Sequence, residues 1–158
     1  MPSSPQAASL ASLLASELQV LESFVVLLER EQELLAGGAT ELLTALSAEK
    51  SGTARELSRL AAERDGELSR LGHPPGRDGM DAWTAAAGSN SRDNWLRLLD
   101  LAAQARALNE ANGKLIGLQL QHNQQALNIL MSAVDQAVTY GPDGQQKPGG
   151  GGRSLGSA

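Results

Sequence analysis

Apolar residues recur at alternating three- and four-residue steps from Ser91 to Val138, the longest regular pattern in the chain. This spacing marks one face of an α-helix, and the helix would extend about 70 Å at 1.5 Å per residue. We call the stripe the main seam; it comprises Trp95, Leu98, Ala102, Ala105, Asn109, Asn112, Ile116, Leu120, Asn123, Leu127, Leu130, Val134 and Val138. The pattern therefore predicts one long helix over residues 91–138.

The same helix carries apolar residues on a second side. At about 100° per residue, Leu118 and Ile129 project nearly opposite to the main seam. A helix that is apolar on two sides needs two packing layers in its own chain or a partner. We expect Leu120 and Leu127 of the main seam to be core residues. The opposite side is then either a docking surface or a core face covered by the second helix or the segment around Trp83.

Two further leucine-periodic segments precede the long helix. The first starts at Pro5 behind a Ser4 cap and stops at the glycines before Ala39, with Gly38 suited to the helix end. The second carries a sparser stripe over residues 42–71, and Thr40 is expected to cap its start. A short connection between two such helices predicts an antiparallel helical hairpin.

The connection to the long helix contains three glycines and two prolines between residues 72 and 79, which we expect to exclude helix. Met80–Ala87 is predicted as a two-turn helix anchored by Trp83. The composition becomes glycine-rich after Tyr140, which predicts a disordered tail. The predicted fold is all-α: a bundle domain of three long helices over residues 1–140, with a short helix in the connection, and a flexible tail over residues 141–158.

The composition restricts the classes of function. The chain has 158 residues, a formal net charge of -5 and no cysteine, which excludes disulfides and cysteine ligands or nucleophiles. The 13 Lys and Arg residues are scattered among 18 acidic residues, unlike a nucleic-acid footprint. Because no run of 18 apolar residues or basic leader is present, we expect no signal peptide, no membrane insertion and a cytoplasmic location.

No pattern typical of a catalytic, cofactor or metal site stands out. His73 and His122 have no second histidine at ligand spacing. Carboxylate pairs such as Glu29 and Glu33 fit a solvated helix face better than acid–base catalysis. The glycine run at 149–152 lacks the lysine and the preceding strand of a phosphate-binding loop. We therefore expect a protein that is not an enzyme and binds no cofactor or metal.

Asn109, Asn112 and Asn123 are polar residues at positions of the otherwise apolar main seam, which is unusual for a packed helix face. An amide facing a leucine layer needs a hydrogen-bond partner or costs about 1–3 kcal/mol. Each amide either fixes the register of packed helices or contacts a partner backbone. Gly113 permits close backbone approach. Asn112 and Gly113 could instead form a turn, although their flanks have helical spacing.

The C-terminal third of the chain carries a recognisable combination of motifs. Residues 108–116 read Leu-Asn-Glu-Ala-Asn-Gly-Lys-Leu-Ile, and residues 139–144 read Thr-Tyr-Gly-Pro-Asp-Gly. Together with Asn123, Leu127 and the leucine-rich first helix, these motifs resemble the FlgN-type flagellar export chaperones, a family of small, acidic, all-helical proteins. The resemblance covers most of the chain but excludes residues 72–88 and the tail after Gly144.

The resemblance implies a cytoplasmic, ATP-independent chaperone of flagellar type III export. Such a protein would bind the C-terminal helical segments of hook-associated proteins, prevent their premature assembly and deliver them to the export apparatus. Tyr140 would either cap the bundle or make the first cargo contact. The candidate partner-binding residues are Leu115, Leu118, Ile129, Met131 and Tyr140, and the candidate register residues are Asn109, Asn112, Gly113 and Asn123. The alternative is a self-assembling coiled-coil structural or adaptor protein that forms a homo-oligomer through its second apolar face.

Overall fold

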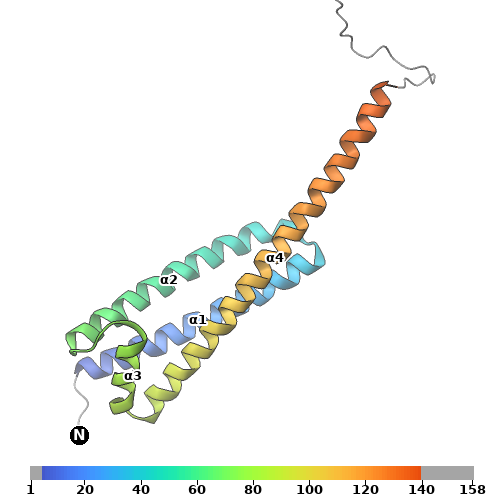
Figure 1. Ribbon diagram of the computed structural model, residues 1–158. Helices are drawn as coiled ribbons and strands as arrows, with labels where there is room; N and C mark the ends of the chain where they lie inside the picture. Colours follow the sequence, from blue (N-terminus) through green and yellow to red (C-terminus); the bar gives the residue numbers. More distant parts are fainter. Residues whose placement is uncertain (1–4, 140–158) are drawn as a thin grey trace, which may run out of the picture. The chain divides into compact units, whose positions relative to one another are not determined.

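The computed structural model describes the backbone of residues 5–139 and the side chains of residues 9–135. The elements are α1 (Pro5–Gly37), a short 3-10 turn η1 (Thr40–Leu42), α2 (Leu43–Arg70), α3 (Gly76–Ala87) and α4 (Ser89–Thr139) (Figure 1). Over this described range the chain contains no strand, and the predicted all-α fold with three long helices and one short helix is confirmed. Ser4, Tyr140 and the expected tail lie outside the described residues.

The chain divides into two compact units, residues 1–115 and residues 116–158. In the first unit, α1 and α2 form an antiparallel hairpin joined through Gly38, whose φ of 72° is accessible to glycine. Two ion pairs set the register, since Glu17 contacts Arg64 and Glu31 contacts Lys50. Glu31, which follows Glu17 in α1, pairs with Lys50, which precedes Arg64 in α2. This reversed order shows that the two helices are antiparallel. The predicted hairpin is confirmed.

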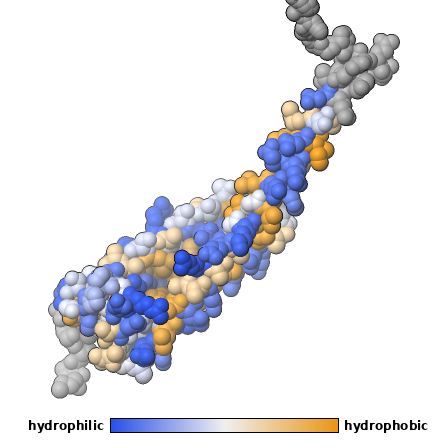
Figure 2. Space-filling model, in the orientation of Figure 1, coloured by the Kyte–Doolittle hydropathy of each residue, from blue (hydrophilic) through white to orange (hydrophobic). Residues whose placement is uncertain are grey.

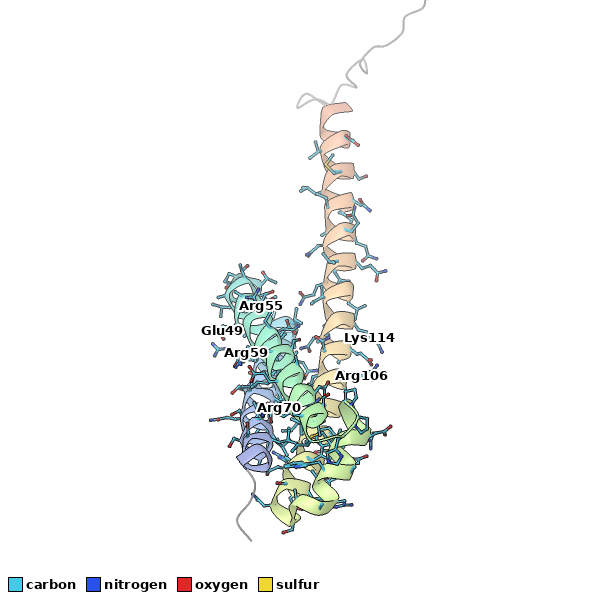
Figure 3. All side chains as sticks on the ribbon, turned by 90° about the vertical axis from the view of Figure 1, so that its left-hand side faces the viewer. Glu49, Arg55, Arg59, Arg70, Arg106 and Lys114 are labelled. Atoms are coloured by element: carbon cyan, nitrogen blue, oxygen red, sulfur yellow. The ribbon has the colours of Figure 1, made fainter. Side chains whose placement is uncertain are left out.

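The core of the first unit is built mainly from α1 and the beginning of α4. Polar contacts place Arg97 of α4 near Glu22 of α1, and Asn112 near Leu28 of α1, so the two helices run parallel. The buried hydrophobic cluster consists of Leu10, Leu14, Leu21, Val25, Leu28, Leu68, Met80, Trp83, Trp95, Leu98, Leu101 and Ala105. Helix α2 contributes Leu68 to this cluster, and its solvent-facing side carries charged residues, among them Arg55, Arg59 and Arg70 (Figure 3).

The connection between α2 and α4 differs from its prediction. Helix α3 begins at Gly76, so the expected loop over 72–79 extends too far toward the C-terminus. Extended Pro75 precedes the helix, and Asp65 accepts the N–H of Gly76 at 3.0 Å, which satisfies one of the free donors at a helix start. A Cβ at position 79 would overlap the carbonyl oxygen of Pro74. Gly79 therefore permits a close backbone approach and does not break the helix.

Two smaller expectations for the first two helices also need correction. Thr40 does not cap α2, because η1 intervenes and the helix start has no side-chain cap. Residues Ser9–Gly37 of α1 are long and apolar enough to cross a membrane by length and composition, contrary to the expected absence of such a segment. The core helix of a soluble protein passes the same test. Here the apolar face of α1 is in the core, and its buried carboxylates Glu17 and Glu31 are ion-paired with α2.

The second unit, as far as it is described, is the C-terminal part of α4. Leu120 and Leu127 are 64% and 50% exposed, so the expectation that they are core residues is wrong. The main seam is buried at Trp95, Leu98 and Ala105 but not beyond Asn112. A single helix cannot bury its own apolar stripe, because burial requires a second element packed against it. The physical reason for the error is that helical periodicity identifies a face and not its neighbour.

Candidate docking surface

The exposed C-terminal part of α4 carries a dense group of apolar side chains. Large exposed hydrophobic residues in this part are Ile116, Leu118, Leu120, Leu127, Ile129, Leu130, Met131 and Val134. Figure 2 shows apolar side chains lying beside hydrophilic ones along this helix. Single exposed hydrophobic residues are ordinary on protein surfaces, but a group this dense on one stretch of helix is typical of an interaction site. We call residues 115–134 the docking segment.

The docking segment has no Asp, Glu, Lys or Arg. Its charged boundaries are Lys114, labelled in Figure 3, and Asp135. The preceding part of α4, residues 89–114, contains seven charged residues. The polar side chains of the segment are instead mainly amides of Gln and Asn, which make hydrogen bonds without a net charge. The segment can therefore bury its surface against another helix without removing a full charge from water.

The structure places the predicted partner-binding residues as follows. Leu118, Ile129 and Met131 are 52%, 71% and 53% exposed. Leu115 is half-buried at the end of the first unit. Tyr140 lies outside the described residues. Leu118, Ile129 and Met131 all lie in the docking segment. The main-seam residues of this segment are exposed as well, so the expected division of the helix into a core face and a docking face is wrong within the docking segment.

The register residues separate into one buried and three exposed positions. Asn112 is 1% exposed, whereas Asn109, Gly113 and Asn123 are exposed. Asn112 therefore lies in a packed layer of its own chain, whereas the prediction that Asn109 and Asn123 fix register or contact a partner backbone stays a prediction. Asn109 is turned away from the layer because Leu108 takes the inward position and packs against the core. Helix α4 continues through Asn112 and Gly113, which excludes the alternative of a turn.

Asn112 connects three helices through a buried polar network. Its side-chain amide donates to the backbone carbonyl of Leu28 and to Oε1 of Glu31, both at 2.9 Å. The same carboxylate accepts from Nζ of Lys50 at 3.1 Å. The network joins α1, α2 and α4 and satisfies the Nδ2 group of Asn112, whereas Oδ1 of the same amide is buried without a hydrogen-bond partner among the described residues. It is the last fully buried layer of α4 before the docking segment.

A second polar cluster lies nearer the α3 end of the bundle. Arg64 contacts Glu17 at 2.5 Å and lies over the ring of Trp95, 5.5 Å from its centroid. Burial raises the pKa of the Glu17 carboxyl above its usual range, although Arg64 acts in the opposite direction. The indole Nε1 of Trp95 donates to Asp81 at 2.7 Å. These contacts hold α4 against the hairpin, and sequence periodicity gave no indication of the ion pair.

Sequence reasoning also missed that Leu120, Leu127 and Leu130 belong to the exposed surface. The signal that could have indicated their exposure is helix length, because α4 has 51 residues and α1 has 33. Helix α4 is therefore longer than α1 by about 27 Å at 1.5 Å per residue. Within the described residues no group of three or more His, Cys, Asp or Glu side chains could hold a metal ion.

Comparisons with known proteins agree with the sequence resemblance. The family model described as FlgN protein matches residues 1–148. A protein named flagella synthesis protein FlgN, from Yersinia enterocolitica, is 29% identical over 136 residues, covering 85% of this chain and 86% of the relative. A relative of the same name from Y. enterocolitica serotype O:8 / biotype 1B has the same identity and coverage. No solved structure matches the chain significantly. The resemblance is confirmed at the level of the family, and the chain belongs to the FlgN family.

Proposed function

We propose that this protein is a cytoplasmic export chaperone of the flagellar type III secretion system. In this proposal it binds the C-terminal helical segments of hook-associated proteins, prevents their premature assembly and brings them to the export apparatus. Membership of the FlgN family supports a role in flagellum assembly. The observation that supports chaperone activity most directly is the docking segment, an uncharged helix whose large apolar side chains are exposed.

The chemistry of the segment suits reversible masking of another helix. Segments that assemble by helix packing expose apolar stripes, and a helix with a free apolar face can cover one. Burying four or five leucine-sized side chains contributes roughly 6–15 kcal/mol before the costs of association. Ordering a flexible cargo segment offsets about 2–5 kcal/mol of this, and loss of translational freedom offsets more. The expected dissociation constants are therefore micromolar to nanomolar, which allows release at export.

A titration with the C-terminal segment of a hook-associated protein from the same bacterium tests the proposal. The variant Leu127→Ala with Leu130→Ala should weaken binding at least tenfold, because both side chains are exposed in the docking segment. Leu96→Ala is the matched control, since Leu96 is 49% exposed on the same helix outside the segment. The control should bind as the wild type does, and all melting temperatures should agree within about 2 °C.

Two results would contradict the chaperone proposal. The first is an equal loss of binding in the Leu96 control, which would mean that the docking segment has no special role. The second is a defined oligomer of the isolated protein at low concentration that persists when cargo is added. That result would favour the alternative function, a self-assembling structural or adaptor protein, because the exposed apolar residues would then be an interface between copies.

A further inference from the structure

One polar residue interrupts the most regular apolar stripe of the docking segment. Steps of four and three residues connect Ile116, Leu120, Asn123, Leu127, Leu130 and Val134, which we call the neutral seam. This spacing repeats every seven residues and is that of the contact positions of a coiled coil. Asn123 is an exposed amide with two leucine-type layers before it and three after it. A single asparagine among such layers typically fixes the alignment of the paired helices.

Asn112 shows what the same helix does with an asparagine in a packed layer. Asn123 follows Asn112 by eleven residues, about three turns, so the two side chains project from nearly the same side of α4. Asn112 is buried and donates to Leu28 and Glu31 of α1. A buried amide at position 123 would likewise require a hydrogen-bonding group from the element that covers it.

The charge pattern of the segment limits what that group can be. The positions that flank the neutral seam and would face a paired helix are uncharged, namely Gly117, Gln119, Gln124, Ala126, Met131 and Ala133. In a coiled coil these flanking positions usually carry the ion pairs that select the partner. Without them, a charged side chain opposite Asn123 would be buried with no countercharge, which is unfavourable. An uncharged hydrogen-bonding side chain such as Asn, Gln, Ser or Thr fits.

We propose that the neutral seam pairs with one amphipathic cargo helix whose contact layers are apolar except for a single uncharged hydrogen-bonding residue opposite Asn123. Asn123 is then the residue that sets register and selects among cargo helices. The inference rests on the proposed function, since it takes the occupant to be a cargo helix. It adds the chemistry by which that helix is recognised, which apolar area alone does not specify.

Three fluorescently labelled helical peptides, each about three heptads long and used with the full chain, test this inference. The all-leucine peptide has leucine at every contact layer. The central-Asn peptide has Asn in place of the central leucine, and the displaced-Asn peptide has Asn one heptad away from the centre. Each peptide has five contact layers, so that a peptide covering Ile116 to Leu130 places its central layer opposite Asn123 in either helix orientation. The wild type should bind the central-Asn peptide at least tenfold more tightly than the displaced-Asn peptide, as measured by fluorescence anisotropy.

The variant Asn123→Leu should lose this tenfold preference and bind the all-leucine peptide most tightly. Asn109→Leu is the matched control, because Asn109 is an exposed asparagine on the same helix outside the docking segment. It should keep the wild-type order of affinities. Raising KCl from about 50 to about 500 mM should change each dissociation constant less than about threefold, since no charges are paired. Melting curves of both variants establish that the fold is retained.

The register role is overturned if the wild type binds the matched and displaced peptides equally, if Asn123→Leu keeps the preference, or if no peptide binds. A strong salt dependence would overturn the neutral character of the interface. These results are distinct from a failure of the proposed function. In that case the peptides would show the expected order while the segment of a hook-associated protein failed to bind.

Discussion

Residues 89–115 and 116–139 belong to one uninterrupted helix, yet their surroundings differ. The first part contributes Trp95, Leu98 and Leu101 to the core, and it solvates its outer side with charged residues. In the second part the large apolar side chains from Ile116 to Val134 are exposed, and charge is absent up to Asp135. The apolar period is the same in both parts. The comparison shows that periodicity specifies a helix and its apolar face, whereas neighbours and charge determine whether that face serves folding or binding.

The most severe test of this comparison replaces one buried and one exposed leucine. Leu28→Ala should destabilise the protein by about 2–5 kcal/mol, because Leu28 is fully buried and its loss leaves a cavity. Leu127→Ala removes the same atoms from an exposed position and should change the free energy of unfolding by no more than about 0.5 kcal/mol. Urea denaturation of the two variants measures both values. Similar losses would show that the second part of α4 is core after all.

Much of the fold was predictable because it rests on strong local patterns. The helix start at Pro5 and the helix end before Gly38 follow from backbone preferences, and the hairpin follows from the short connection between leucine stripes. The docking segment was predictable as an apolar surplus on the long helix. Its extent was not, because Leu120 and Leu127 have the spacing of core residues and yet are exposed.

The boundary between the two parts of α4 can be tested at Asn112. Asn112→Ala removes the donor to Leu28 and Glu31 and should cost about 1–3 kcal/mol, since the carbonyl and the carboxylate lose a buried partner. Asn109→Ala, on the exposed side one turn earlier, should stay within about 0.5 kcal/mol of the wild type. Thermal and urea unfolding measure both. Equal effects of the two substitutions would mean that Asn112 is not the last packed layer.

Close packing within the bundle can be tested with two helical glycines. Gly79→Ala should destabilise by about 1–3 kcal/mol, because its methyl group would overlap the carbonyl of Pro74 and force the connection apart. Gly52→Ala should instead stabilise by about 0.5–1 kcal/mol, since nothing lies within 4 Å and alanine is the better helix former. Opposite shifts in urea midpoint are expected. A gain in stability at position 79 would show that the approach to Pro74 is loose.

The parts that were not predictable depend on contacts between distant residues. Glu17 and Arg64 are 47 positions apart, and nothing in the local pattern of either helix indicates that they pair beside Trp95. The local preference of glycine predicts a helix break at Gly79, whereas the structure shows that the carbonyl of Pro74 leaves no room for a side chain there. The ion pair and the close approach at Gly79 can be identified only from the folded structure, because they depend on which surfaces pack against each other.

The smallest expected effect is a pH dependence of the free energy of unfolding. It arises from Glu17, a titratable group in the core, whereas the docking segment has no acidic residue. Burial raises the pKa of Glu17 in the folded protein above its ordinary value of about 4.5, so the folded state binds more protons than the unfolded state just above that pH. The free energy of unfolding therefore falls as pH rises from about 4.5 through the raised pKa, and it levels off above it. Glu17→Gln lacks this titration. The stability of the wild type minus that of Glu17→Gln should decrease with rising pH over this interval, as measured by urea unfolding at closely spaced pH values. A difference that increases with pH would mean that Arg64 outweighs burial and that the carboxylate is favoured in the core.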